Sequence, residues 1–534
     1  MELETVSEEK KIVNFFLNKN ILISYDILQI LKEKADLDGF YKTIIEGIRS
    51  TDFLFLNKDL NNIINMYKSI DINWFDLEKS RVLFEKGKNK KIYEKFLGYL
   101  SEKKETPKIE IEKEEEKVKI ITSYNEDSKK RDIQDFVQYF NARYKAIEKI
   151  LKNRQEMRNI TSINRLIGKK DKENISIIGL VKDKRTTKNN NLILTVEDPT
   201  SSIKVLVNKN KPDLFEQAKE IVLDEVIGVV GVNGENIVFA NNILWPDIPT
   251  NRELKKSSDE AYAIFLSDLH VGSKNFLPDD FNKFIKWIRG EIGNEKQKEI
   301  SKKVRYIFIL GDLVDGCGIY PEQDKELITK DIYQQYEECA NLLKQIPSDI
   351  HLIICPGNHD AMRIAEPQPP LYRDFAGPIY RIKNAIMVSN PSLINIHSSK
   401  NFSGFDVLLY HGYSFDFFVA NCDSIRNKGG YNRADLIMKF LLKRRHLAPT
   451  HTSNLYIPDV EKDPLVIETV PDFFATGHIH KSIASNYRNI TMICGSCWQS
   501  KTTFQEKVGH NPEPSRVPIV NLQTRDVKIL RFGS

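Results

Sequence analysis

The stretch that decides the fold is YIFILGDLVD, residues 306–315. A run of large apolar residues that ends at a Gly-Asp turn is typical of a strand buried on both faces. Four other apolar runs also end in Asp, His or Asn: AIFLSDLH, HLIICPGNHD, VLLYHG and FFATGHIH. A sheet fixes the backbone while loops at its strand ends expose side chains. The five runs therefore predict an α/β domain that carries its chemistry along one edge of the sheet.

The polar residues at these strand ends are types that bind divalent metal ions. Asp, His and Asn without Cys suit a pair of ions that keep open positions for water and phosphate. In an extended segment, residues i and i+2 project to the same side, so Asp268 with His270, and His478 with His480, can each face one cluster. Asp312 has two oxygens at a tight turn and is the natural bridge between two ions. The predicted ligands are Asp268, His270, Asp312, Asn358, His411, His478 and His480.

Other residues near the predicted ligands are candidates for supporting roles. His359 adjoins Asn358 and is the candidate catalytic residue, as a general acid or as a stabiliser of charge on the phosphate. Arg363 is a candidate phosphate contact, although a solvated loop arginine fits the sequence equally well. Asp315 and Asp360 are expected to orient ligands rather than to bind metal. The mixed donor set favours two divalent ions of the Mn, Fe or Zn type, with Mn preferred and Mg as a further alternative.

Residues 174–250 change from helical to alternating periodicity. Five short apolar strands are expected there, with the helix DLFEQAKEI between the third and the fourth. This order is the layout of an OB-fold barrel. Aromatic residues are sparse on these strands, so we favour protein docking over nucleic-acid binding for the barrel.

The residues before the barrel fall into three regions. Residues 1–75 repeat apolar residues at three- and four-residue steps and predict an N-terminal α-helical module. Residues 76–133 form a connecting region whose dense mixed charge predicts a flexible linker. Residues 134–173 contain a basic helix and are expected to be a helical connector to the barrel at 174–250 and the α/β domain at 251–534.

Composition sets the class of protein. The chain has 534 residues, 41% of them hydrophobic, and a net charge of +5, so several globular domains are expected and net charge alone does not indicate a nucleic-acid partner. No apolar stretch reaches the roughly 18 residues of a membrane span, and the acidic start is unlike a secretion signal. Six cysteines form no disulfide framework. We expect a cytoplasmic protein without a membrane partner.

The ordered motifs D-x-H, G-D-x-x-D, G-N-H-D, H and G-H-x-H resemble those of the calcineurin-like metallophosphoesterase superfamily. The preceding OB-like barrel and the run PGNHDAMRIAEPQPPL narrow the resemblance to the small subunits of archaeal family-D DNA polymerases, which are related to the B subunits of eukaryotic replicative polymerases. The resemblance implies a C-terminal β-sandwich flanked by helices. It also implies that one ion takes Asp268, His270, Asp312 and His480, and the other Asp312, Asn358, His411 and His478.

The same resemblance implies a function. It is that of a proofreading 3′→5′ exonuclease that hydrolyses phosphodiesters by a two-metal mechanism and serves as accessory subunit of a replicative polymerase. The implied partners are a large catalytic subunit, in a heterodimer or larger assembly, and single-stranded or mismatched 3′ ends of DNA; a sliding clamp is a further candidate. A non-catalytic scaffold subunit and a stand-alone phosphodiesterase are the alternatives.

Overall fold

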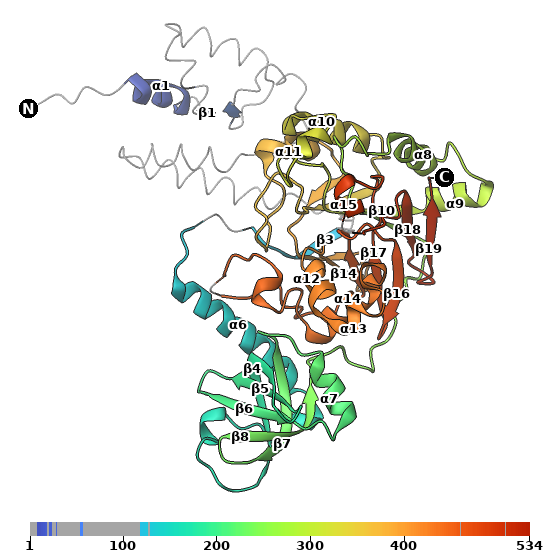
Figure 1. Ribbon diagram of the computed structural model, residues 1–534. Coiled ribbons are helices and arrows are strands. Elements are labelled where there is room, and N and C mark those ends of the chain that lie inside the picture. The colour runs from blue at the N-terminus through green and yellow to red at the C-terminus, as the bar shows by residue number, and fades with distance from the viewer. Residues whose placement is uncertain are drawn as a thin grey trace, which may run out of the picture. The chain divides into compact units, whose positions relative to one another are not determined.

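The computed structural model describes residues 8–18, 21–23, 28, 54–56, 118–125, 129–459, 461–507 and 509–533 (Figure 1). The chain divides into two compact units, residues 1–112 and 113–534. Among the described residues, no helix is long and apolar enough to cross a bilayer.

The first unit contains a helix and two short strands in the part that is described. Helix α1 spans Glu8–Leu17, and strands β1 (Ile21–Ile23) and β2 (Leu54–Leu56) pair in parallel. The prediction of a purely helical module is therefore wrong for this part. Short apolar runs such as Ile21–Ile23 fit a strand and a helix equally well, and periodicity alone does not separate the two. The other helices expected within 1–75 lie outside the described residues.

The second unit begins with a strand inside the predicted linker. Strand β3 (Val118–Ser123) pairs antiparallel with β13 (Ser392–Ile396) at the edge of a sheet. The prediction of a linker followed the charged residues around this strand. It overlooked the β-branched side chains of Val118, Ile120 and Ile121, which favour a strand. The expectation of a linker therefore fails at β3.

A capped helix leads to the barrel. Helix α6 (Ile133–Lys152) begins with a capping box in which Asp132 accepts hydrogen bonds from Gln134 N and Asp135 N, while the Asp135 side chain accepts one from Asp132 N. Its buried residues include Tyr139 and Arg143. Two short 3₁₀ turns, Gln155–Met157 and Ile163–Arg165, follow.

Five strands then close into a barrel in the order β4-β5-β6-β8-β7, with one helix before β7. This is the strand order of an OB-like barrel, and the five predicted strands and the helix are all confirmed. Apolar residues alternate into the barrel core, as Leu192, Leu194 and Val196 do on β5. The elements are β4 (Asn174–Thr186), β5 (Leu192–Glu197), β6 (Ser202–Val207), α7 (Pro212–Lys219), β7 (Val226–Asn233) and β8 (Ile237–Leu244).

The C-terminal domain is a sandwich of two six-stranded sheets. One sheet has the order β12-β11-β10-β9-β18-β19 and the other β16-β17-β15-β14-β13-β3. Buried residues from both sheets, among them Phe265, Phe308 and Phe473, form one cluster between the sheets. The strands of the first sheet are β9 (Tyr262–Leu266), β10 (Val304–Leu310), β11 (His351–Cys355), β12 (Ala385–Met387), β18 (Arg516–Asn521) and β19 (Val527–Arg531). Besides β3 and β13, those of the second are β14 (Phe405–Leu409), β15 (Phe473–Thr476), β16 (Ile483–Tyr487) and β17 (Ile490–Cys494).

Helices pack on the outer faces of this sandwich. Phe281, Tyr336 and Ile379 belong to a core cluster with the first sheet, and Phe418 and Phe440 to a cluster with the second. The helices are α8 (Pro278–Ile288), α9 (Glu295–Lys302), α10 (Ile332–Leu343), α11 (Arg373–Tyr380), α12 (Phe415–Asn421), α13 (Asp423–Arg426), α14 (Ala434–Arg444) and α15 (Thr503–Lys507). The predicted β-sandwich flanked by helices is thus what the α/β domain shows.

Candidate metal centre

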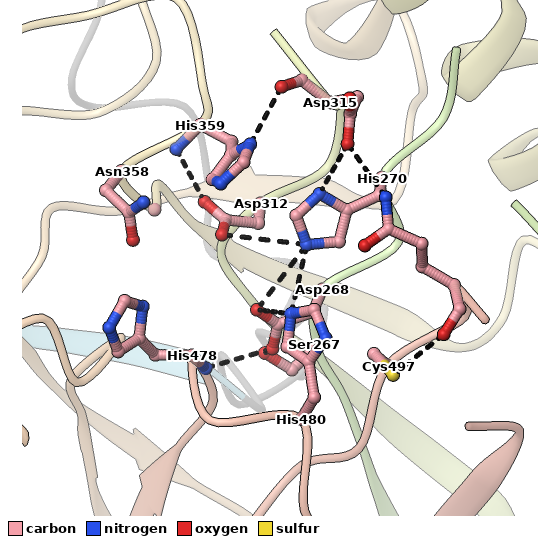
Figure 2. Close-up of polar contacts among 12 residues, drawn as sticks. Ser267, Asp268, His270, Asp312, Asp315, Asn358, His359, His478, His480 and Cys497 are labelled. Atoms are coloured by element: carbon pink, nitrogen blue, oxygen red, sulfur yellow. Dashed lines mark hydrogen bonds and ion pairs between the residues drawn. The ribbon is translucent and has the colours of Figure 1, made fainter. Parts of the chain in front are cut away.

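The predicted ligands follow five strands of the two sheets. Strands β9, β10 and β11 are parallel in the first sheet, and β14 and β15 are parallel in the second. Asp268, Asp312 and Asn358 come directly after the first three strands, and His411 and His478 after the other two. The carboxyl ends of parallel strands share one edge, so the donors gather there. Figure 2 shows Asp268, Asp312, Asn358 and His478 close together at this edge.

The backbone at most of these donors is left-handed rather than extended. The φ angles are +51° at Asp268, +51° at His270, +52° at Asp312, +71° at His478 and +52° at His480. Non-glycine residues rarely adopt this conformation, which clusters at functional sites. Asp268 and His270 belong to one donor group, whereas His478 and His480 belong to two neighbouring groups. Tight turns bring these residues there, and the expected extended geometry is wrong.

The first donor group consists of Asp268, His270 and His480, whose ligand atoms lie within 4.8 Å of one another. The two Nε2 atoms of His270 and His480 are 3.2 Å apart. Asp268 Oδ1 lies 3.3 Å from His480 Nε2 and 3.9 Å from His270 Nε2. This oxygen is buried and has no hydrogen-bond partner among the described residues. A buried carboxylate oxygen beside two ring nitrogens is the arrangement that a cation satisfies.

The second donor group consists of Asp312, His411 and His478, again within 4.8 Å. His411 Nε2 lies 3.3 Å from Asp312 Oδ2 and 3.0 Å from Asn358 Oδ1. His411 Nδ1 donates to Leu310 O at 2.6 Å, so Nε2 presents its lone pair to the group when the ring is neutral.

Asp312 stands between the two groups. Its Oδ2 lies 3.3 Å from His411 Nε2 and 3.9 Å from His270 Nε2. Gly357 packs so closely that a Cβ there would stand 2.2 Å from Asp312 Oδ1, and a Cβ at Gly311 would stand 2.5 Å from His411 Nδ1. Both glycines are therefore required by close approach to the donors.

The electrostatics of the centre arise from burial and from pairing of unlike charges. Burial opposes the ionisation of Asp312, yet His411 and His359 hold the pKa of this carboxyl well below its usual range. Burial likewise disfavours a charged His411, but Asp312 raises the pKa of this histidine to about 10. Protons on histidine thus balance the carboxylates, and a divalent cation would replace those protons on binding.

Two further carboxylates contact the donors, and their role in orienting them stays a prediction; Asp315 also forms a possible metal-binding group with His270 and His359. Asp315 Oδ1 lies 3.0 Å from His270 Nδ1, which leaves His270 Nε2 for the cluster. Asp360 accepts hydrogen bonds from the backbone N–H groups of Asp312 at 3.0 Å and Gly357 at 2.8 Å. Burial, with Asp312 nearby, raises the pKa of Asp360 to about 7.

His359 and Arg363 have different surroundings. His359 Nδ1 donates to Asp315 O at 2.8 Å, and its ring lies edge-on to His270 with centroids 4.7 Å apart. Burial lowers the pKa of His359, which keeps the ring neutral near pH 7. Arg363 instead donates to Pro367 O and lies 5.2 Å over the ring of Tyr124, so these contacts hold its loop. A substrate contact by Arg363 stays a prediction.

Sequence reasoning missed three residues that contact the donors. Gln499 Nε2 donates to Asp315 Oδ1 at 3.0 Å, Gln505 Nε2 lies 2.9 Å from His480 Nδ1, and Asp416 Oδ2 lies 3.0 Å from His478 Nε2. None belongs to a motif, and neither the two amides nor the Asp416 carboxylate carries a local signal of its contact with the centre. Only the fold identifies them.

The donor set fits two divalent ions. The assignment of Asp268, His270, Asp312 and His480 to one ion, and of Asp312, Asn358, His411 and His478 to the other, stays a prediction. Nitrogen and oxygen donors of this kind suit Mn, Fe or Zn, and the geometry does not select among them.

The chain thus combines an OB-like barrel with an α/β sandwich that has a cluster of His and Asp side chains at its strand ends. The family model for the B subunits of DNA polymerases alpha and epsilon matches residues 263–485. The DNA polymerase II small subunit of Methanothermobacter thermautotrophicus is 40% identical over 402 residues, which is 75% of this chain and 80% of that protein. That of Archaeoglobus fulgidus is 38% identical over 457 residues, 83% of this chain and 88% of that protein.

The chain belongs to the family of archaeal family-D DNA polymerase (DNA polymerase II) small subunits. It covers 64% of the Pyrococcus furiosus relative, which is 39% identical. A solved archaeal phosphodiesterase is similar over 50% of this chain and 98% of its own, at 12% identity and a TM-score of 0.25.

Proposed function

We propose that this small subunit is a metal-dependent 3′→5′ exonuclease that proofreads alongside a large catalytic polymerase subunit. The observation that supports the proposal is the pair of donor groups that meet at Asp312. Ions about 3.5–4 Å apart would supply an activated water and neutralise the phosphate oxygens. The small-subunit relatives support a large-subunit partner, and single-stranded or mismatched 3′ ends are the proposed substrate.

The chain's own residues have separate tasks in this reaction. Water attacks phosphorus, the bond from phosphorus to the 3′ oxygen of the preceding nucleotide breaks, and a nucleoside 5′-monophosphate leaves. Asp315 holds His270, and Asp360 holds the turn of Asp312, so the ligand atoms are oriented before substrate arrives. His359 keeps its proton at Nδ1 against Asp315 O, so Nε2 is the atom at which it accepts or returns a proton.

The test uses the purified full chain, with and without its large subunit, and oligonucleotides labelled at the 5′ or the 3′ end. With Mn²⁺ the parent should shorten single strands from the 3′ end. Asp312→Ala and His359→Ala should each lose about 10²-fold or more of this activity, the range of a lost acid–base or electrostatic group. His397→Ala is the matched control, because His397 contacts Ser257 and Asp259 away from the donors.

Equal rates for parent and both variants would show that the activity, or its site, is assigned wrongly. No hydrolysis by the parent in either form, together with no bound metal, would favour the scaffold alternative. Hydrolysis of small phosphodiesters without any associated large subunit would favour a stand-alone phosphodiesterase.

A further inference from the structure

The outer surface of the barrel has two unlike sides. Helix α6 packs against β4 and β7, where Tyr144, Ile147 and Leu151 meet Ile178 and Val226 in one buried cluster. We call the side beneath α6 the covered side. The opposite side, the open side, consists of β5, β6 and β8. The residues of these strands that point away from the barrel core are exposed or partly exposed.

The charges of the barrel are divided between these sides. On the covered side, acidic residues contact the C-terminal domain: Glu225 Oε2 lies 2.5 Å from Arg444 Nε, Glu220 Oε2 accepts from Ser424 Oγ at 2.5 Å, and Asp224 Oδ2 accepts from His451 N at 2.9 Å. These contacts join the covered side to the C-terminal domain of the same chain.

On the open side, a continuous row of apolar residues crosses the strands. The register pairs Arg185 with Ile193, Ile193 with Leu206, Leu206 with Phe239, and Phe239 with Val232. Paired residues in a sheet project to the same face, so the row forms one stripe. Phe239 is 45% exposed although its ring is large and apolar. It is the single aromatic residue on the strands of the described barrel.

Cations border this stripe. Arg185 stands at its end, and Lys204 lies beside it, opposite Thr195 on β5 and Ile237 on β8. The loop after β4 carries Lys188, and Lys209 is near this loop because its N–H donates to Asn191 Oδ1 at 3.0 Å. All four cations are exposed. Two acids also lie on this side: Glu197, which is paired with Lys182 at 3.1 Å, and the exposed Asp183, which stands opposite Thr195.

An exposed aromatic ring within a border of cations suits single-stranded DNA. A base stacks on the ring irrespective of sequence, while lysine and arginine contact the phosphates on either side. A purely apolar protein partner would not account for the cations, and duplex DNA offers no free base face to Phe239. We propose that the β5–β6–β8 face of the barrel binds single-stranded DNA, with a base stacked on Phe239 and phosphates on Arg185 and Lys204.

The test measures binding of a fluorescein-labelled dT20 to the full chain by anisotropy, in EDTA so that no hydrolysis occurs. Phe239→Ala should weaken binding about tenfold, since stacking on one aromatic ring contributes at that scale. Phe239→Tyr keeps the ring and should bind like the parent, whereas Phe239→Leu keeps apolar bulk and should bind like Phe239→Ala. Thermal melts check that each variant is folded.

Charge reversal tests the cations. The double variant Arg185→Glu with Lys204→Glu should lower the affinity about tenfold at low salt and reduce its salt dependence, because phosphate contacts release counterions. The matched control is the double variant Lys145→Glu with Lys149→Glu on the exposed face of α6, which changes the net charge by the same amount on the covered side and should leave the affinity within about twofold.

Equal affinity for parent and Phe239→Ala would overturn the proposal, as would Phe239→Leu binding as tightly as Phe239→Tyr, because apolar contact alone would then suffice. No binding of dT20 at micromolar protein would overturn it too. The outcome does not depend on the nuclease: Asp312→Ala should lose hydrolysis and keep dT20 binding.

Discussion

The buried cluster around Asp463 and the metal centre around Asp312 are built from similar residue types, but their polar atoms are satisfied in different ways. Asp463 Oδ2 accepts from Arg143 Nε and from His446 Nε2, each at 2.7 Å, and its Oδ1 accepts from Tyr139 at 2.7 Å. His446 Nδ1 accepts from Ala448 N at 3.0 Å. Each donor in this cluster has an acceptor, and each ring nitrogen has one defined role.

The polar atoms of the metal centre are less completely hydrogen-bonded. Asp268 Oδ1 is buried with no hydrogen-bond partner, and two histidine Nε2 atoms face each other at 3.2 Å. The comparison teaches that a closed cluster, in which every polar atom is hydrogen-bonded as around Asp463, joins parts of a fold. A cluster with unused lone pairs, as around Asp312, can bind a cation. Arg143 illustrates the joining role, because it also donates to Pro449 O at 2.6 Å and to Asp224 O at 3.3 Å.

The largest expected effect on stability comes from removing the Arg143 guanidinium from the closed cluster around Asp463. Arg143→Met leaves Asp463 buried without its cation, and we expect the free energy of unfolding to fall by about 3–5 kcal/mol, as for other broken buried pairs. Urea unfolding measures the change. Lys145→Met, on the exposed face of the same helix, should change it by less than about 0.5 kcal/mol. A loss for Arg143→Met no larger than for Lys145→Met would remove the distinction between the clusters.

Acid should also act on the closed cluster. Burial, together with Arg143, lowers the pKa of His446 from 6.5 to about 4 despite Asp463 beside it. Between these pH values the unfolded chain binds a proton that the folded chain does not, so stability is full above pH 6.5 and falls as the pH drops towards 4. The loss amounts to about 3 kcal/mol at most.

Unfolding at a series of pH values measures this slope. His446→Gln removes the titrating ring and should flatten the curve in that window, whereas His351→Gln, at a histidine outside both clusters, should not. A parent curve without any slope there would mean that His446 is not held neutral.

The metal centre should respond to cations and the closed cluster should not. With Mn²⁺ at 100 times its dissociation constant, the parent should gain about 2.7 kcal/mol of stability, because the ion binds the folded state alone. Arg143→Met should gain as much, and Asp312→Ala should gain little. Thermal melts with Mn²⁺ and with EDTA give the difference. An equal gain in Asp312→Ala would place the bound ions elsewhere.

The two clusters also show how much the sequence can predict. The gathering of the seven candidate donors was predictable because each follows a buried apolar run, and the run fixes the strand end that carries it. Their left-handed backbone was not predictable, because the residue types at Asp268 and His480 do not by themselves indicate a positive φ. The Asp463 cluster was not predicted either, because Arg143 and Asp463 are 320 residues apart and belong to no motif. Strand β3 was missed for a related reason: its neighbours are charged, and only pairing with β13 stabilises it.

The smallest effect should come from a residue that the sequence did not single out. Gln499 Nε2 donates to Asp315 Oδ1 at 3.0 Å and to Ser273 Oγ at 2.8 Å, and the same Asp315 oxygen holds His270 Nδ1. Gln499→Leu should leave the donors in place but less well oriented, so the affinity for Mn²⁺ should fall about tenfold with the fold unchanged. Calorimetric titration of Mn²⁺ measures it, with the exposed Gln334→Leu on α10 as the control. Unaltered affinity in Gln499→Leu would show that Asp315 positions His270 without the hydrogen bond from Gln499. Residues beyond Asp315 would then not contribute to orienting the metal ligands.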